Sequence, residues 1–139
     1  MGEPLKILLV EDNPSDQELT LLAFERLKIV NPLICAEDGE EALDILESSL
    51  GALPGLILLD LNMPGMDGRE FITTVKADPR FLKIPVVVLT SSGAAEDIDV
   101  AYRQHCAGYI RKPVDLEGLM RVVRIIDQYW FEIVALPAP

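Results

Sequence analysis

Three acidic side chains stand where apolar runs end, and these are the residues of this sequence best suited to chemistry. Glu11 and Asp12 follow the run ILLV at 7–10, and Asp60 follows the run LILL at 56–59. Carboxylates that are brought close together repel one another, so a fold accepts them when a cation or a proton relieves the repulsion. Mg²⁺ prefers hard oxygen ligands, and it is the ion that this set of acids predicts.

Two further polar side chains end later apolar runs: Thr90 ends IPVVVLT, and Lys112 follows AGYIR. Taken singly, each polar residue has an ordinary explanation. Thr90 could be a helix cap or turn residue, and Lys112 an exposed surface lysine. The acids could simply be polar residues at strand ends, with Asp12 or Asn13 capping the next helix. Together, a hydroxyl, an ammonium and an ion would position and neutralise three phosphoryl oxygens. Asp60 would then be the nucleophile, and the product would be an acyl phosphate.

Five apolar runs alternate with five amphipathic helical patterns, and this framework has to position the polar residues. Short apolar runs suit strands that are covered on both faces of a parallel sheet. Strict alternation predicts an α/β, flavodoxin-like (βα)5 three-layer sandwich with strand order 2-1-3-4-5. Ligands in such sheets bind at the carboxyl ends of the strands, where the polar residues stand. The expected strands are 7–10, 33–36, 56–60, 84–90 and 108–111, and the expected helices are 14–27, 39–49, 67–77, 95–105 and 115–134.

Composition sets the broad class of the protein. The chain has 139 residues, of which 50% are hydrophobic and 25% charged, so we expect one domain over 1–139, with 128–139 as a C-terminal helix extension and tail. No window is apolar enough for a membrane span, and the start MGEPLK does not resemble a signal peptide, so a cytoplasmic location is expected. The net charge of −11 argues against nucleic-acid binding. Cys35 and Cys106 form no metal-binding motif and are expected to be reduced thiols.

Four motifs at the ends of expected strands resemble the receiver domain of two-component response regulators. The motifs are EDN at 11–13, DLNMPGMDG at 60–68, TSS at 90–92 and KP at 112–113, and the resemblance extends over residues 5–127. It implies a protein that accepts a phosphoryl group from the phosphohistidine of a sensor histidine kinase. Such a protein catalyses only its own phosphorylation and slow dephosphorylation, and it is not otherwise an enzyme.

The resemblance assigns the acidic residues. Asp60 corresponds to the phosphoacceptor, and Glu11, Asp12, Asp60 and the backbone carbonyl of Asn62 correspond to the Mg²⁺ ligands. Many receivers have aspartate where this chain has Glu11, and it stays open whether this longer side chain binds the ion directly or through water.

The resemblance also assigns a switch. Thr90 corresponds to the switch hydroxyl, Lys112 to the phosphate-binding lysine and Tyr109 to the switch aromatic. Pro113 follows a cis peptide in the family, so a cis Lys112–Pro113 bond is expected to turn Lys112 into the site. Phosphorylation would draw the Thr90 hydroxyl inward and let Tyr109 rotate, which would change the face formed by 95–105, 108–111 and the last helix. Alternatively, Tyr109 is a half-buried aromatic with its hydroxyl in water.

The last expected helix carries two adjacent apolar stripes. One comprises Leu119, Val123, Ile126, Trp130 and Ile133, and the other Val122, Ile125, Tyr129 and Leu136. A sheet can cover only one stripe, so Val122, Ile125 and Tyr129 are expected to form a homodimer face together with 95–105 and 108–111. Alternatively, the tail WFEIVALPAP folds back and covers the second stripe itself.

The segments VEDNPSD, TSS and YWFEIVALP resemble the small regulators that partner bacteriophytochrome histidine kinases. Since no output domain follows in this sequence, signalling through protein contact or phosphate relay is expected. Within the family the alternatives are a chemotaxis-like motor-binding regulator, a phosphorelay receiver and a docking module that is never phosphorylated. Outside the family, a flavodoxin would need a phosphate loop after the first strand, and a haloacid dehalogenase-type phosphatase would need its nucleophile there. The chain has neither arrangement.

Overall fold

The computed structural model describes residues 5–61, 68–90, 95–113 and 115–129. Its centre is a parallel sheet of five strands in the order β2-β1-β3-β4-β5, which confirms the predicted topology. The strands are β1 (Ile7–Val10), β2 (Leu33–Ala36), β3 (Leu56–Leu59), β4 (Val86–Thr90) and β5 (Gly108–Arg111). The helices are α1 (Pro14–Arg26), α2 (Gly39–Ser48), α3 (Gly68–Ala77), α4 (Ala95–Arg103) and α5 (Leu116–Ile126).

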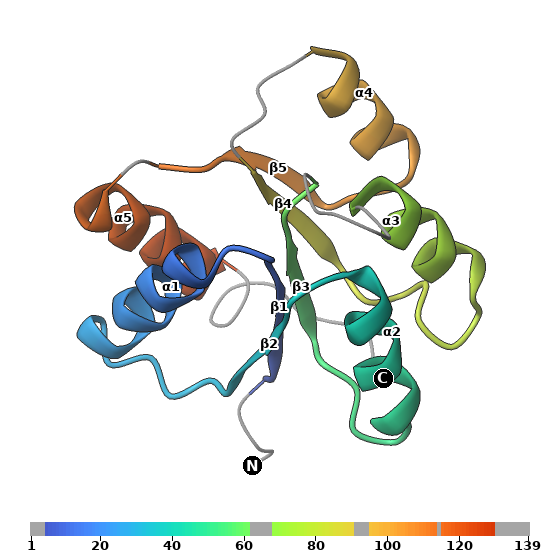
Figure 1. Cartoon of the computed structure of the whole chain (residues 1–139), viewed down its shortest axis with the longest axis horizontal. Helices are drawn as coiled ribbons and strands as arrows, with labels where there is room; N and C mark the ends of the chain where they lie inside the picture. Colours follow the sequence, from blue (N-terminus) through green and yellow to red (C-terminus); the bar gives the residue numbers. More distant parts are fainter. Residues whose placement is uncertain (1–4, 62–67, 91–94, 114, 130–139) are drawn as a thin grey trace.

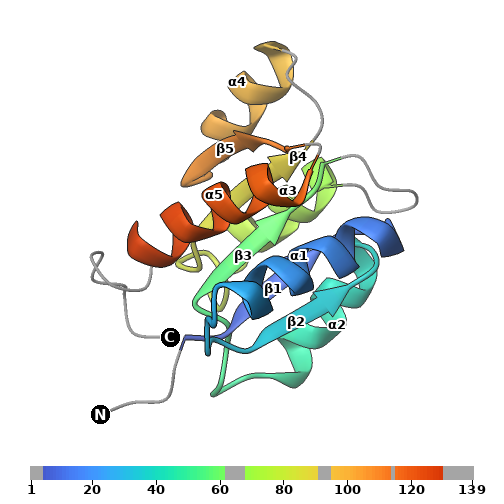
Figure 2. The ribbon, with the colours of Figure 1, turned by 90° about the vertical axis from the view of Figure 1, so that its left-hand side faces the viewer.

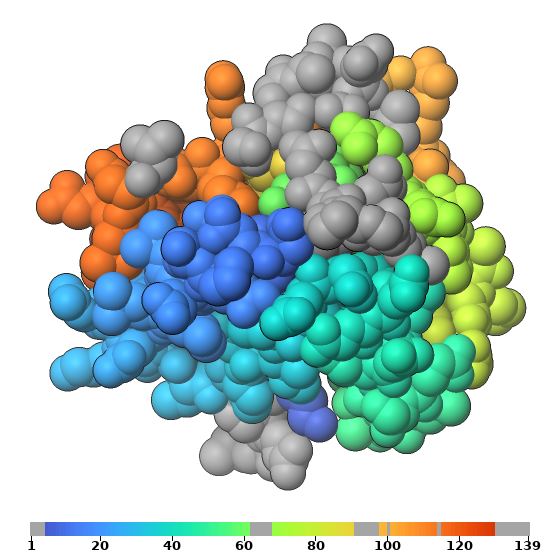
Figure 3. All heavy atoms as spheres, viewed as in Figure 1, coloured from blue at the N-terminus to red at the C-terminus, as the bar shows by residue number. Residues whose placement is uncertain are grey.

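Helices cover both faces of the sheet, as Figure 1 shows: α1 and α5 lie on one side, and α2, α3 and α4 lie on the other. The turned view shows α1 and α5 side by side across the same face (Figure 2). In the space-filling view the blue residues of α1 and the orange residues of α5 form a continuous surface (Figure 3). The chain is therefore a three-layer α/β sandwich.

The strand sequences explain these layers. The central strands β1, β3 and β4 are buried along their whole length, whereas most residues of the edge strands β2 and β5 are half-buried. Successive side chains of a strand point to opposite faces, so an apolar run supplies both cores at once. In β1, Ile7 and Leu9 pack with α1 and α5, while Leu8 and Val10 pack with α2 and α3.

Side-chain caps fix the starts of three helices. Asn13 accepts hydrogen bonds from the backbone N–H groups of Ser15 and Asp16 at the start of α1. Asp38 caps α2, and Asp115 caps α5. Each cap pairs backbone donors that a helix leaves without a partner.

One predicted helix end is wrong, and another lies outside the described residues. The helix expected to reach residue 105 ends at Arg103, and His105 adopts a left-handed backbone conformation with φ of 62°. The last helix is α-helical to Ile126 and π-helical over 127–129, and its predicted end at residue 134 lies outside the described residues. Most of the predicted tail, together with Trp130, Ile133 and Leu136, lies outside the described residues. No helix in the described part of the chain combines the length and apolar character of a membrane span.

Candidate functional site

The two main acids lie side by side because β1 and β3 pair in register. Glu11 directly follows β1 and Asp60 directly follows β3, and the residues before them, Val10 and Leu59, are partners in the ladder. The Asp60 backbone N–H continues the ladder by donating to the Val10 carbonyl at 3.0 Å. Pairing of two apolar strands therefore delivers two carboxylates to the same point at the edge of the sheet.

Three acids gather at this edge. Glu11, Asp12 and Asp60 each offer a carboxylate oxygen, and these oxygens all lie within 4.8 Å of one another. Glu11 and Asp60 are buried, with 3% and 7% of their surfaces exposed, while Asp12 is half-buried. Hard oxygens at this spacing fit a divalent cation such as Mg²⁺, which takes one or two carboxylates and keeps waters. Asn62, the fourth predicted ligand, lies outside the described residues.

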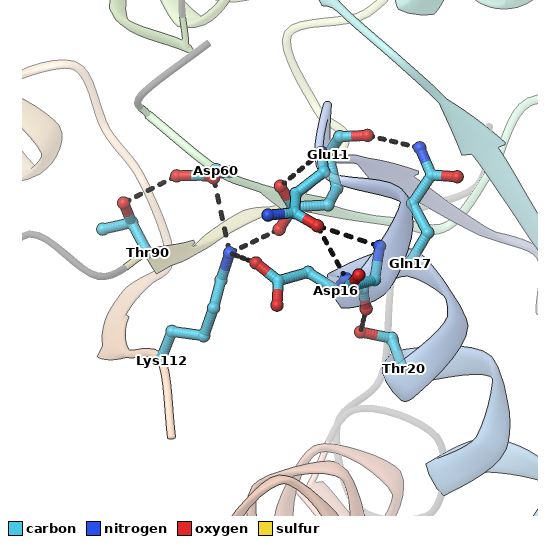
Figure 4. A network of polar contacts seen from close by, with 9 residues as sticks. Glu11, Asp16, Gln17, Thr20, Asp60, Thr90 and Lys112 are labelled. Carbon is cyan, nitrogen blue, oxygen red and sulfur yellow. Dashed lines mark hydrogen bonds and ion pairs between the residues drawn. The ribbon is translucent and has the colours of Figure 1, made fainter. Parts of the chain in front are cut away.

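Thr90 and Asp60 are joined directly. The Thr90 hydroxyl, at the end of β4 and fully buried, donates a hydrogen bond of 2.7 Å to Asp60 Oδ1 (Figure 4). The sequence predicted that these two residues would share the site because β3 and β4 both end there. The other oxygen of the same carboxylate, Oδ2, faces Lys112.

Lys112 lies among several acids. Its Nζ pairs with Glu11 Oε1, and it lies 3.0 Å from Asp16 Oδ2 and 3.4 Å from Asp60 Oδ2 (Figure 4). The backbone N–H of Lys112 donates to the Thr90 carbonyl at 2.7 Å and so extends the pairing of β4 with β5 by one residue. A cation thus lies within ion-pair distance of the candidate nucleophile.

The predicted cis Lys112–Pro113 bond is wrong. No peptide bond between described residues is cis, so the bond before Pro113 is trans. The trans form is the more stable one for such bonds by about 0.5–1 kcal/mol. Lys112 reaches the acids in this form because its long side chain starts from a backbone already held beside Thr90.

Asp16 is a site residue that the sequence reasoning missed. It stands in the first turn of α1, and its carboxylate contacts Lys112 (Figure 4). The available signal was its position within EDNPSD: an acid one helical turn after the strand-end acids faces the same edge of the sheet.

Burial and charge shift the proton affinities of two groups. Burial raises the pKa of Glu11 to about 7, with the Asp60 charge adding to the shift and Lys112 opposing it. Burial alone would lower the pKa of Lys112, but hydrogen bonds to Glu11 and Asp16 outweigh it and raise that pKa above its ordinary value. The lysine is therefore charged, and a positive charge near Glu11 favours the ionised form of this carboxyl.

Gly68 allows α3 to begin directly against the end of β3. Its backbone N–H donates to the Leu61 carbonyl at 3.1 Å. A Cβ at this position would lie 2.5 Å from Leu61 Cα and 2.6 Å from the Asp60 carbonyl oxygen. A side chain would therefore push against the backbone that carries Asp60.

Tyr109 and the predicted dimer face occupy intermediate and exposed positions. Tyr109, in β5, is half-buried and packs against the core on the side of α2 to α4. Val122 is half-buried against the other core, whereas Ile125 is 63% exposed and Tyr129 is 51% exposed. The second apolar stripe of the last helix is thus exposed in part.

Comparison with known proteins agrees with this geometry. The response regulator receiver domain model matches residues 7–124. The chain is 41% identical to the probable methanogenesis regulatory protein FilR2 of Methanothrix harundinacea over 99% of this chain and 90% of that protein. It is 40% identical to response regulator Rcp1 of Synechocystis sp. over 97% of this chain and 95% of that protein.

Solved structures agree as well. The Mn²⁺-bound form of Rcp1 superposes with a TM-score of 0.86 at 39% identity, covering 97% of this chain and 100% of that one. The phosphorylated cyanobacterial phytochrome response regulator RcpA superposes with a TM-score of 0.89 at 37% identity, covering 98% of this chain and 100% of that one. Fold, site geometry and sequence agree, and the chain belongs to the response regulator receiver domain family.

Proposed function

We propose that this receiver domain accepts a phosphoryl group on Asp60 from the phosphohistidine of a sensor histidine kinase, in a Mg²⁺-dependent reaction. One observation carries the proposal: the two oxygens of the buried Asp60 carboxylate are shared between the Thr90 hydroxyl and the Lys112 ammonium, with Glu11 and Asp12 beside them. Nucleophile, neutralising groups and metal ligands thus occupy one edge of the sheet, as phosphoryl transfer requires.

The side chains divide the chemistry among them. An oxygen of Asp60 attacks phosphorus, the bond from phosphorus to the histidine nitrogen breaks, and its electron pair returns to the imidazole. Lys112 can transfer its contact from Glu11 to a phosphoryl oxygen, and the Thr90 hydroxyl can turn from Asp60 Oδ1 to another. Glu11, Asp12 and Asp60, with the Asn62 carbonyl, would hold Mg²⁺, which when bound neutralises charge on the transferring group.

Mass spectrometry of the intact protein tests the acceptor. After incubation with acetyl phosphate and Mg²⁺, the parent protein should gain the mass of one phosphoryl group, whereas Asp60→Asn should not. EDTA should prevent the gain in the parent. An unmodified parent, as in a docking module that is never phosphorylated, or an equal gain in Asp60→Asn would refute the proposal. Steady turnover of a phosphoester would favour a phosphatase instead.

The proposed signal is a change in the face formed by α4, β5 and α5. Rotation of the Thr90 hydroxyl toward the phosphoryl group would vacate space beside β5, which Tyr109 could enter. The half-buried position of Tyr109, paired in register with Val88 two residues before Thr90, supports this role. Unchanged phosphorylation-dependent partner binding in Tyr109→Ala would refute it, with Tyr109→Phe as the variant that keeps the ring.

A phytochrome-type histidine kinase is the proposed partner, with the cytoplasm as the site of the reaction. The likeness to RcpA, a phytochrome response regulator, supports this pairing over nearly the whole chain. Phosphotransfer from a phytochrome-type kinase that exceeds transfer from an unrelated histidine kinase would support it. Equal transfer from both would favour a phosphorelay receiver or a chemotaxis-like regulator. The acidic chain, with a net charge of −11, is not proposed to bind nucleic acid.

Self-association is the second proposed property. Ile125 and Tyr129 expose apolar surface on α5 and the turn that follows it, beside the face that phosphorylation would change. We propose that a second copy of the chain covers this surface in a symmetric homodimer through α4, β5 and α5.

A further inference from the structure

We infer that Asp16 is a positioning residue, which holds the Lys112 ammonium beside Asp60 when Glu11 is occupied by a cation. The inference rests on the proposed function of Asp60. Lys112 Nζ lies 3.0 Å from Asp16 Oδ2 and 3.4 Å from Asp60 Oδ2, so Asp16 lies closer to the lysine than the acceptor does.

Asp16 is held firmly by the first turn of α1. Its backbone N–H donates to Asn13 Oδ1 at 3.2 Å, and its carbonyl accepts a 2.9 Å hydrogen bond from the buried Thr20 hydroxyl. Figure 4 shows the Asp16 carboxylate extending from this helix toward Lys112. The backbone of Asp16 is therefore fixed in place, so its carboxylate can orient the Lys112 ammonium.

The acids have different partners, and this explains why a fourth carboxylate, that of Asp16, is useful. Glu11 belongs both to the cluster of three acids suited to a metal and to the ion pair with Lys112. A cation on Glu11 weakens that ion pair, since the same carboxylate cannot serve two positive charges equally well. Asp16 is not one of the three clustered acids, so its contact with Lys112 survives.

The surroundings of Lys112 leave it another direction in which to turn. A small hollow between α1 and α5 is lined by Asp16 and Lys112 and by apolar side chains that include Leu19, Leu89 and Leu119. Without the Asp16 carboxylate, the apolar stem of Lys112 could lean over this hollow, with its ammonium turned toward solvent and away from Asp60. The proposed role of Asp16 is to make that orientation unfavourable.

A double-mutant cycle on phosphorylation rate tests the inference. Asp16→Asn should slow phosphorylation by acetyl phosphate at saturating Mg²⁺ by about three- to tenfold, a modest loss because the Asp16 side chain is 35% exposed. Asp16→Glu should restore part of the rate. In a Lys112→Ala background, Asp16→Asn should have no further effect. Glu18→Gln removes one charge from the exposed face of the same helix and should match the parent.

Thermal unfolding in EDTA supplies a readout that needs neither metal nor phosphorylation. Asp16→Asn should lower the midpoint temperature of unfolding in the parent background. The same substitution should leave that temperature unchanged in Lys112→Ala, because the lost contact is with Lys112. A parent-like rate in Asp16→Asn, or a loss of equal size in both backgrounds, would overturn the inference. A parent protein that is not phosphorylated at all would instead refute the proposed function.

Discussion

The carboxyl edge of the sheet and the outer face of α5 both hold side chains in surroundings that usually cost free energy. At the edge, Glu11 and Asp60 are buried, and each contacts Lys112. On α5, Ile125 is 63% exposed although Val123 and Ile126, its neighbours in sequence, are buried. At the sheet edge, polar groups of the same chain compensate the free-energy cost of burying the acids. On the outer face of α5, an apolar side chain remains in contact with water.

The two regions therefore differ in what the structure indicates about their roles, a reaction at the sheet edge and a contact surface on α5. No buried side-chain nitrogen or oxygen among the described residues lacks a hydrogen-bond partner, so the polar groups of the acidic edge have their partners within the chain. An exposed apolar side chain carries no comparable information about what covers it. The fold therefore brings the proposed reacting residues together, whereas the proposed dimer face on α5 depends on a test of assembly.

Replacing Lys112 by alanine should have the largest effect, because it removes the cation on which the acidic edge depends. The phosphorylation rate should fall about a hundredfold or more, as expected for loss of a group that neutralises the transferring oxygens. Rates with acetyl phosphate and Mg²⁺ measure the loss. Lys76→Ala is the matched control: this half-buried lysine donates to the Leu82 and Ile84 carbonyls away from the site. Equal rates in the two variants would contradict the role given to Lys112.

Gly68→Ala should destabilise the protein by about 2 kcal/mol, because the new Cβ overlaps the backbone of Asp60 and Leu61. Gly108→Ala places a Cβ at 3.9 Å from a Val87 methyl, which is ordinary contact, and should change stability by less than about 0.5 kcal/mol. Urea unfolding of both variants provides the comparison. Similar free energies of unfolding for the two would show that α3 can shift without cost.

The affinity for Mg²⁺ should rise with pH, because a ligand has to lose its proton before it binds. Glu11 has a pKa raised to about 7 in the metal-free protein, so most of it is protonated at pH 6 and little at pH 8. The dissociation constant should therefore fall about tenfold between these values, as one proton is displaced on binding. Calorimetric titration measures the dissociation constant for Mg²⁺ at each pH. Glu11→Gln should remove its dependence on pH. A constant affinity in the parent would mean that Glu11 does not exchange its proton for the ion.

Ile125→Asp should have the smallest effect on the fold and a clear effect on assembly. The side chain is exposed, so the free energy of unfolding should change by less than about 0.5 kcal/mol. Sedimentation should show a dimer in the parent and a monomer in the variant. Gln128→Asp adds the same charge at an exposed position of the turn after α5 and serves as the control. A monomer in both the parent and Ile125→Asp would exclude the homodimer.

The sequence predicts the sheet and most of the site for the same reason. Apolar runs such as Ile7–Val10 and Leu56–Leu59 must be buried on both faces, and a parallel sheet then aligns the polar residues that follow them. Asp60, Thr90 and Lys112 could thus be grouped without coordinates. The direct contact of Asp16 with Lys112 could not: the position of Asp16 in EDNPSD indicates that it faces the same edge, but its distance from the residue after β5 depends on how the start of α1 is placed.

The errors have equally local causes. α4 ends at Arg103, before the predicted residue 105, because His105 adopts a left-handed backbone conformation that leaves no signal in the sequence. The cis bond before Pro113 came from the family resemblance, and the long Lys112 side chain meets the same need without it.

The Gly68 backbone N–H donates to the Leu61 carbonyl and brings the start of α3 back to the residue that follows Asp60. On the other side, the Asp60 backbone N–H donates to the Val10 carbonyl. Main-chain contacts from two different elements therefore set the position of Asp60. Redesign of the side chains around this carboxylate can keep its position as long as these main-chain contacts are preserved.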